Sequence, residues 1–183
     1  MDDLVTERLV LHPLDAAEAE RLLDPRPRDR AAWAPGYPDE TDAVGARTFL
    51  ATIAETGDPH PFGAYEIRRR SDGLAIGGLG FHGPADAEGG VTIGYGLIPS
   101  ARGAGYATEA VRALLDLARR HGARRVRGDT DRENVASQRV MTAAGLRLVA
   151  EDDRLRYYEL SWVHPEEGAV SGPVEGPPAR AAS

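Results

Sequence analysis

The residues best suited to chemistry lie in the segment RGAGYAT, residues 102–108, which joins a β-rich stretch to an amphipathic one. Gly103 and Gly105 let the backbone turn tightly, and the small side chains leave several amide groups pointing outward at the start of a helix. Amides in this arrangement bind phosphate groups. The spacing therefore predicts a phosphate-binding loop, whose members are Arg102, Gly103, Ala104, Gly105, Tyr106, Ala107 and Thr108.

A second polar group opens a helix that we predict over residues 135–144. Val140 belongs to its buried stripe, and Ser137 lies on the same inward side, with Asn134 three residues before it. In one interpretation Asn134 is simply the N-cap and Ser137 bonds to its own helix backbone. In the other, the pair faces a ligand.

Two elements must position the phosphate loop. Residues 91–98 are apolar and β-rich, and Pro99 ends this strand because it lacks an amide donor. After the loop, apolar residues recur at helical spacing from Ala107 to Ala118, and Gly122 ends the pattern. The loop is thus expected at a strand-to-helix turn.

The rest of the chain predicts a single α/β domain over residues 1–163, with a central mixed sheet of six or seven strands and about four helices. The other expected strands are residues 4–14, 62–68, 74–81, 124–128, 146–149 and 156–162, and the other helices are 16–23 and 43–55. Asp72 and Gly73 form the turn of an antiparallel hairpin. Pairing should become parallel after the phosphate loop, with a V-shaped opening at the loop's strand. Residues 164–183, rich in Pro and Gly, are expected to be a flexible tail.

The composition excludes several kinds of chemistry. The 183 residues include no cysteine, so a cysteine acyl-enzyme, a disulfide and a thiolate metal site are ruled out, and we expect no metal. All 22 basic residues are arginine, which excludes Schiff-base catalysis. The net charge of −7 argues against a nucleic-acid partner. No apolar run suggests a signal peptide or membrane span, so we expect a cytoplasmic protein without a membrane partner.

The loop sequence R-G-x-G-Y-A-T-E-A resembles the pyrophosphate loop of the GNAT N-acetyltransferases, with its pattern R/Q-x-x-G-x-G/A, through Arg102, Gly105 and Ala107. The sequence N-V-A-S-x-R-V-M-x-x-A-G, which begins at Asn134, is similar to the second motif of that family. With both motifs present, we favour the ligand-facing interpretation of Ser137. The opening T-E-R-L-V-L-H-P-L resembles the ribosomal-protein N-terminal acetyltransferase branch (RimJ/RimL-type).

The resemblance implies that the protein moves an acetyl group from acetyl-CoA, or a longer acyl group, to a primary amine. The acceptor would be an amine-bearing small molecule or a protein N-terminus, attacked directly in a ternary complex, and the enzyme would be a monomer or homodimer. The pantetheine arm would pair with the end of the strand, which corresponds to Gly96, Leu97 and Ile98. Asn134 and Ser137 would approach the pantetheine and the departing sulfur. By the same resemblance, Trp33 and Tyr37 are candidate contacts to the acceptor.

Spacing does not identify the general base. The candidates are Glu88, His82, Asp131 and Glu159, and the candidate acids are Tyr157 or Tyr158 on the last strand. Three positions depart from the family pattern. Ala104 replaces a frequent basic residue, Leu146 replaces an aromatic one, and Val149 replaces an acidic residue common in the ribosomal-protein branch.

Two other functions compete with the acetyltransferase. Gly103-x-Gly105 with Asp129 after the next strand would suit a dinucleotide-binding oxidoreductase, although Thr108 replaces its third glycine. A non-catalytic acyl-CoA sensor would keep the loop but lack a working base.

Overall fold

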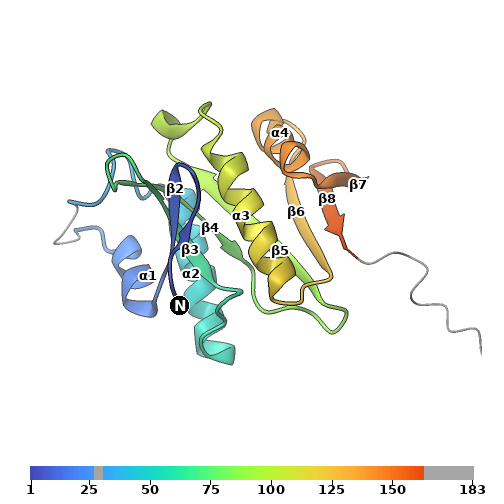
Figure 1. Ribbon diagram of the computed structural model, residues 1–183, viewed down its shortest axis with the longest axis horizontal. Coiled ribbons are helices and arrows are strands. Elements are labelled where there is room, and N and C mark those ends of the chain that lie inside the picture. The colour runs from blue at the N-terminus through green and yellow to red at the C-terminus, as the bar shows by residue number, and fades with distance from the viewer. Residues whose placement is uncertain (27–30, 163–183) are drawn as a thin grey trace, which may run out of the picture.

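One open sheet of eight strands runs through the molecule, in the order β1-β2-β3-β4-β5-β6-β8-β7 (Figure 1). The computed structural model describes residues 1–26 and 31–162. The strands are β1 (Leu4–Val5), β2 (Leu9–Pro13), β3 (Ala64–Arg69), β4 (Ala75–Phe81), β5 (Gly90–Leu97), β6 (Arg125–Asp131), β7 (Arg147–Glu151) and β8 (Leu155–Ser161). The helices are α1 (Ala16–Leu23), α2 (Glu40–Thr56), the short 3-10 helix η1 (Pro99–Ala101), α3 (Tyr106–Arg120) and α4 (Val135–Ala144). The tail expected at 164–183 lies outside the described residues.

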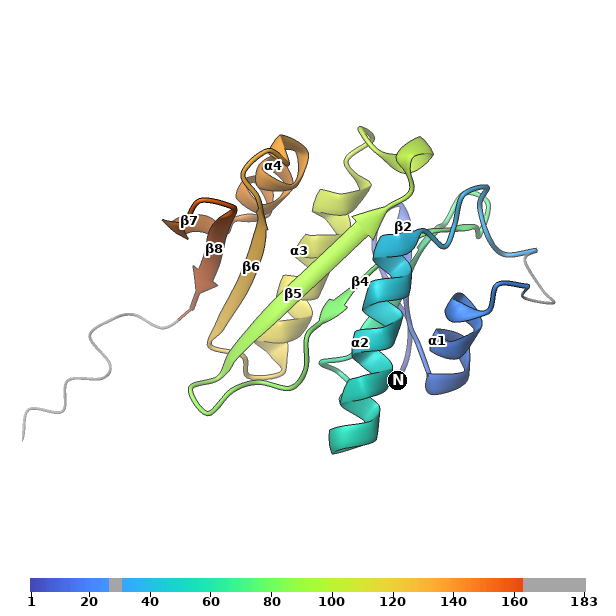
Figure 2. The same ribbon diagram turned by 180° about the vertical axis from the view of Figure 1, so that it is seen from behind.

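The helices cover both faces of the sheet. Helices α3 and α4 lie in front of it in Figure 1, and α1 and α2 lie in front of it in the reverse view of Figure 2. The predicted stripe of α3 is confirmed, because Ala110, Val111 and Leu114 are fully buried. On the other face, both helices start with a capping box, with Asp15 as the N-cap of α1 and Asp39 as the N-cap of α2. The centre of the sheet is thus covered on both faces, whereas β7 at its edge is exposed at all five residues. This arrangement confirms an α/β fold.

The sheet has one strand more than expected because residues 4–14 do not form a single strand. The chain turns between β1 and β2, where the Thr6 amide bonds to the Leu9 carbonyl at 2.9 Å. The Thr6 hydroxyl and the Arg8 amide both donate to Glu109 of α3, which holds the turn in place. The contact with Glu109, about a hundred residues away in sequence, therefore accompanies the division of residues 4–14 into two strands.

The sheet opens beside β5. Strands β5 and β6 pair in parallel only over three positions, from Gly90–Arg125 to Thr92–Arg127, while β6 continues alongside β8 to Asp131. Figure 2 shows β5 and β6 close together at one end and apart at the end where η1 and α3 follow. The expected V-shaped opening is therefore present at the strand that leads into the loop.

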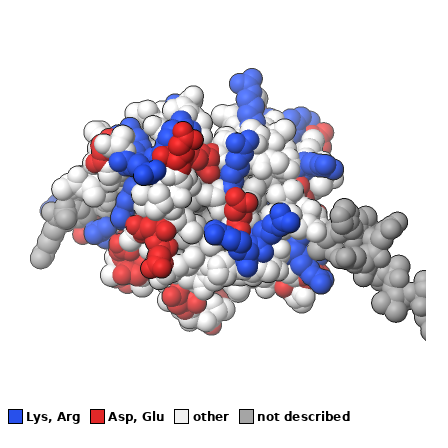
Figure 3. Space-filling model, in the orientation of Figure 1, with Lys and Arg blue, Asp and Glu red and all other residues white. Residues whose placement is uncertain are grey.

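Charge is unevenly distributed on the face shown in Figure 3. Acidic side chains gather over the N-terminus and α1, whereas arginines are spread over the side that carries α3 and α4. Among residues 1–26 and 31–162, no helix is both long and apolar enough to cross a membrane.

Candidate active site

The phosphate loop forms an open turn at the start of α3. Gly103 and Gly105 both have φ of +81°, a conformation that L side chains rarely adopt. Gly105 is the N-cap of α3 and has no side chain to cap it, so the amides of the first helical turn have neither an intrahelical nor a side-chain acceptor. A Cβ built at Gly103 would meet no atom within 4 Å. Within residues 1–26 and 31–162, these amides thus have no helical partner, and the space beside Gly103 is open, while Arg8 Nη2 lies 3.4 Å from a Cβ built at Gly105. Amides in this arrangement suit a pyrophosphate group.

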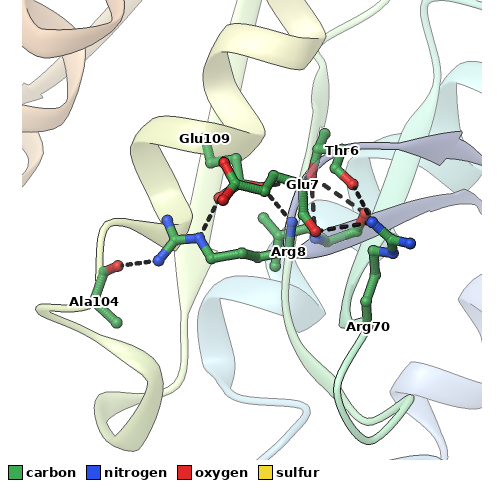
Figure 4. A network of polar contacts seen from close by, with 7 residues as sticks. Thr6, Glu7, Arg8, Arg70, Ala104 and Glu109 are labelled. Carbon is green, nitrogen blue, oxygen red and sulfur yellow. Dashed lines mark hydrogen bonds and ion pairs between the residues drawn. The ribbon is translucent and has the colours of Figure 1, made fainter.

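A polar network holds this loop against the N-terminal hairpin (Figure 4). Arg8 Nη1 donates to the Ala104 carbonyl at 2.8 Å, and its Nε donates to Glu109 at 2.7 Å. Its guanidinium carbon also lies 4.8 Å from the centre of the Tyr106 ring. Arg70 in turn donates to the Thr6 carbonyl of the hairpin at 2.9 Å. Sequence reasoning missed Arg8, although its charge lies beside the loop position where Ala104 replaces a basic residue.

The free edge of β5 faces the opening. The Ile98 amide bonds to Ile76 at 3.0 Å and the Thr92 carbonyl accepts from His82 at 2.9 Å, so even-numbered residues of this stretch bond toward β4. Because bonding direction alternates along a strand, the amides of Tyr95 and Leu97 point into the opening. Of the three residues expected to pair with the donor, Leu97 has its backbone amide directed into the opening, whereas the backbone groups of Gly96 and Ile98 bond to β4.

Arg102 braces the end of this strand. Its Nε donates to the Leu97 carbonyl at 2.8 Å. The side chain that the sequence predicts to bind phosphate thus holds the Leu97 carbonyl, the last acceptor on the free edge.

Across the opening, α4 presents Ser137 to β5. The Ser137 Oγ lies 2.7 Å from the Tyr95 Oη, which also donates to the Ser137 carbonyl at 3.1 Å. Burial raises the pKa of Tyr95, so this phenol stays protonated. Asn134 Oδ1 accepts from the Ser137 amide at 3.0 Å and is the N-cap of α4. Asn134 therefore has the capping position of the first interpretation, while Ser137 faces the opening as in the second. Tyr95 was missed, although a tyrosine between two glycines just before the loop was a signal.

A pocket of about 150 Å³ lies on the opposite face of β5, between the sheet and helices α1 and α2. Its apolar walls include Leu14, Leu22, Ala46, Ala64, Leu79 and Phe81, and its polar lining includes Tyr37, Thr41, Asp42, His82 and Tyr95. Glycines keep it open: a Cβ at Gly96 would come within 2.7 Å of Thr41, and one at Gly94 within 2.8 Å of His82. The pocket includes Tyr95 and Gly96, so one strand serves both the opening and the pocket.

The two aromatic residues expected at the acceptor site have different positions. Tyr37 lines the pocket. Trp33 instead packs beside it, with its ring centroid 5.7 Å from that of Tyr37 in an edge-to-face contact, and its backbone forms an isolated bridge with Ala75. Trp33 therefore supports the wall of the pocket from behind.

The candidate acids and bases are scattered. Glu88 precedes β5 at the end opposite the loop, pairs with Arg125 at 3.3 Å, and has a side chain 72% exposed. Tyr157 donates to Asp152 at 2.7 Å on β8, outside the pocket. The Asp152 hydrogen bond raises the pKa of Tyr157.

Two further candidates lie elsewhere: Glu159 pairs with Arg127 at 3.0 Å, and Asp131 ends β6. Of all these residues, only His82 lines the pocket beside β5.

Comparisons with known proteins agree with this geometry. Residues 8–147 match the model of the acetyltransferase (GNAT) domain family. A search of curated proteins gave no significant match. Among solved structures, an acetyltransferase from Agrobacterium tumefaciens is 27% identical, with a TM-score of 0.61 over 87% of this chain and 94% of the other.

Two ribosomal-protein acetyltransferases share the fold at lower identity. The enzyme for protein S5 alanine from Vibrio fischeri is 16% identical, with a TM-score of 0.65 over 88% of this chain and 97% of the other. RimL, solved in complex with coenzyme A, is 18% identical, with a TM-score of 0.62 over 87% and 98%. The alternative of a dinucleotide-binding oxidoreductase is wrong, because the sheet has one parallel pair where that fold needs a mainly parallel sheet. The family match spans most of the chain, and the protein belongs to the GNAT acetyltransferases.

Proposed function

We propose that the protein transfers an acetyl group from acetyl-CoA to a primary amine, by direct attack of the amine on the thioester. The observation that carries this proposal is the free edge of β5. That edge leads from the opening into the phosphate loop, and the same strand lines a pocket on the other face of the sheet. Donor and acceptor would thus meet at one strand, each from its own side.

The donor side is supported by backbone groups. The free amides at Gly103–Gly105 and in the first turn of α3 would hold the pyrophosphate. The amides of Tyr95 and Leu97 would pair with the pantetheine arm and polarise the thioester carbonyl. Such fixed dipoles stabilise charge in the transition state without having to reorganise.

The leaving sulfur would be received by the hydroxyl pair of Ser137 and Tyr95. Tyr95 Oη can donate its one hydrogen to the Ser137 oxygens, which leaves the Ser137 hydroxyl hydrogen free to donate to a thiolate. Their contact at 2.7 Å fixes each with respect to the other. We expect them to orient the donor and stabilise the thiolate more than to act as strong acids.

The acceptor would approach through the pocket between α2 and the sheet. An amine-bearing small molecule or a protein N-terminus both meet this requirement. Since the chain contains no cysteine, the acetyl group would pass to the amine without a cysteine acyl-enzyme.

Calorimetric titration with acetyl-CoA, CoA and NAD, followed by thiol release against a panel of amines, tests the proposal. Binding of acetyl-CoA with amine-dependent thiol release is the expected result. Binding without release on any amine would favour the sensor. No binding of either CoA compound would refute the assignment of the loop.

A further inference from the structure

Three buried oxygen atoms beside the pocket have no hydrogen-bond partner within residues 1–26 and 31–162. They are the Tyr37 Oη, the Asp42 Oδ1 and the Glu66 Oε2. The three residues are only 7%, 7% and 1% exposed. The Tyr37 hydroxyl and the Glu66 carboxylate lie close enough to interact with each other. The Asp42 Oδ1 is the remaining atom, and because buried polar atoms in native proteins are nearly always paired, it points to a missing ligand.

These residues lie along one row of the sheet. Glu66 of β3 is opposite Gly78 of β4, and Gly78 is opposite Gly96 of β5. A Cβ at Gly78 would lie 3.0 Å from the Asp42 Oδ1, and one at Gly96 would meet Thr41, so the row faces α2. Strands are about 4.8 Å apart, so the row reaches from Glu66 to the strand beside the opening in about 10 Å. Asp42 lies above its middle.

The two oxygens of Asp42 have different tasks. Its Oδ2 accepts from the Asp39 amide at 2.9 Å and completes the capping box of α2. Its Oδ1 has no hydrogen-bond partner in the part of the chain that the structure describes, although the side chain lines the pocket. The cap explains why an acid is positioned here, but it leaves one oxygen free for a ligand.

The surroundings favour a positively charged ligand. Glu66 is a second buried acid, and its other oxygen is paired with Arg68 Nε at 2.7 Å. Burial raises the pKa of Asp42 to about 7, with neighbouring acids adding to the effect. Burial raises the pKa of Tyr37, and the charges of Glu66 and Asp42 and a hydrogen bond to Glu66 add to the effect. The titratable and charged groups around Asp42 are Asp39 of α2, Glu66 and Arg68 of β3, Tyr37, and His82 in the pocket lining.

We propose that Asp42 binds the ammonium group of the acceptor and takes its proton, and so is the general base of the acetyl transfer. This inference depends on the proposed function. The apolar walls and the two acids select a compact aliphatic primary amine that has no carboxylate next to the amine, because a second anion would be repelled.

The proton and electron steps balance as follows. The ammonium gives one proton to the Asp42 Oδ1 and becomes a neutral amine. The nitrogen lone pair forms a bond to the thioester carbonyl carbon, and the carbon–sulfur bond breaks with its electron pair leaving on sulfur. The nitrogen loses a second proton, which the thiolate takes, and Asp42 returns its proton to water as the product leaves.

Asp42→Asn is the decisive variant, because asparagine can still accept from the Asp39 amide but cannot take a proton. We expect acetyl-CoA affinity to change by less than about twofold, and kcat/KM for butylamine to fall about 100-fold or more. For the wild type, kcat/KM should rise as pH increases through the pKa of Asp42, about 7, and fall as pH passes the pKa of the amine. The rising part of this profile is its acid limb. Asp42→Asn should lose the acid limb, and Asp42→Glu should restore part of the rate.

Asp39→Asn is the matched control, because it removes a charge at the same helix end but keeps a capping side chain. It should retain the acid limb. If the limb survives in Asp42→Asn and disappears in His82→Gln, the base is His82 and the inference is overturned.

Binding of butylammonium to the free protein, followed by calorimetry at pH 8, separates this inference from the proposed function. It should be lost in Asp42→Asn and weakened in Glu66→Gln. Glycine, whose carboxylate adjoins its amine, should not bind. Binding of butylammonium without any thiol release would refute the transferase and keep the pocket assignment. Equal binding by wild type and Asp42→Asn, or no binding by wild type, would overturn the assignment.

Discussion

The ion pair between the N-terminal hairpin and α3 should make a measurable contribution to stability. The Glu109 carboxylate accepts from the Thr6 hydroxyl at 2.6 Å, the Arg8 amide at 2.8 Å and the Arg8 Nε at 2.7 Å. Glu109→Gln keeps the shape and one carboxyl-like oxygen. Its amide NH₂, however, would face the Arg8 Nε, so that a donor meets a donor.

The expected loss is that of one charge-assisted hydrogen bond, which contributes about 1.5–3 kcal/mol when well buried. The Arg8 side chain is 43% exposed and that of Glu109 17%, so solvent screening lowers the figure. We take about 1–2 kcal/mol. For a chain of this size, that corresponds to a fall in Tm of about 2–8 °C.

Thermal unfolding followed by circular dichroism measures this difference, with Glu20→Gln on the exposed side of α1 as the control. Burial opposes ionisation of Glu109, but hydrogen bonds from Thr6 and Arg8 outweigh it and lower its pKa. The wild-type advantage is therefore complete above the ordinary pKa of 4.5 and lost as pH falls through the lowered folded value. A Tm gap that stayed constant down to pH 3, or one no larger than that of Glu20→Gln, would refute this reasoning.

Three other substitutions test the donor site and the pocket. Ser137→Ala should lower kcat about tenfold while acetyl-CoA affinity changes little; a loss confined to affinity would contradict the leaving-group role. Gly105→Val should abolish acetyl-CoA binding in calorimetry because a β-branched residue cannot keep φ of +81°. Gly73→Val, with φ of +73° at the β3–β4 turn, imposes similar strain and should still bind. Gly96→Ala should close the pocket against Thr41 and raise KM for the amine, and adding Thr41→Ala should restore it. If the double variant stays impaired, the pocket does not bind the acceptor.

The parts of the site that sequence reasoning found are those determined by local chemistry. Glycines at 103 and 105 need positive φ, and the apolar spacing of α3 fixes which side packs inward, so the loop and its helix follow from neighbouring residues. Ser137 was found through its motif.

The parts that were missed depend on distant contacts. Tyr95 meets Ser137 across 42 positions, and Arg8 meets Glu109 across 101. Asp42 comes just before the helix expected at 43–55 and belongs to no motif, and only the fold places it over Gly78 and near Glu66. No periodicity encodes such pairings, because they depend on how two elements pack.

The gap between β5 and β6 also gives the sheet an internal edge. Unpaired strand edges are sites where another chain can add, and so they promote aggregation. Here the strand carries glycines rather than a continuous apolar surface, Arg102 occupies the Leu97 carbonyl, and the Tyr95–Ser137 contact spans the gap. The residues that prepare the strand for a substrate therefore also protect it from self-association. Variants at Arg102 or Ser137 should be assayed for aggregation as well as for activity.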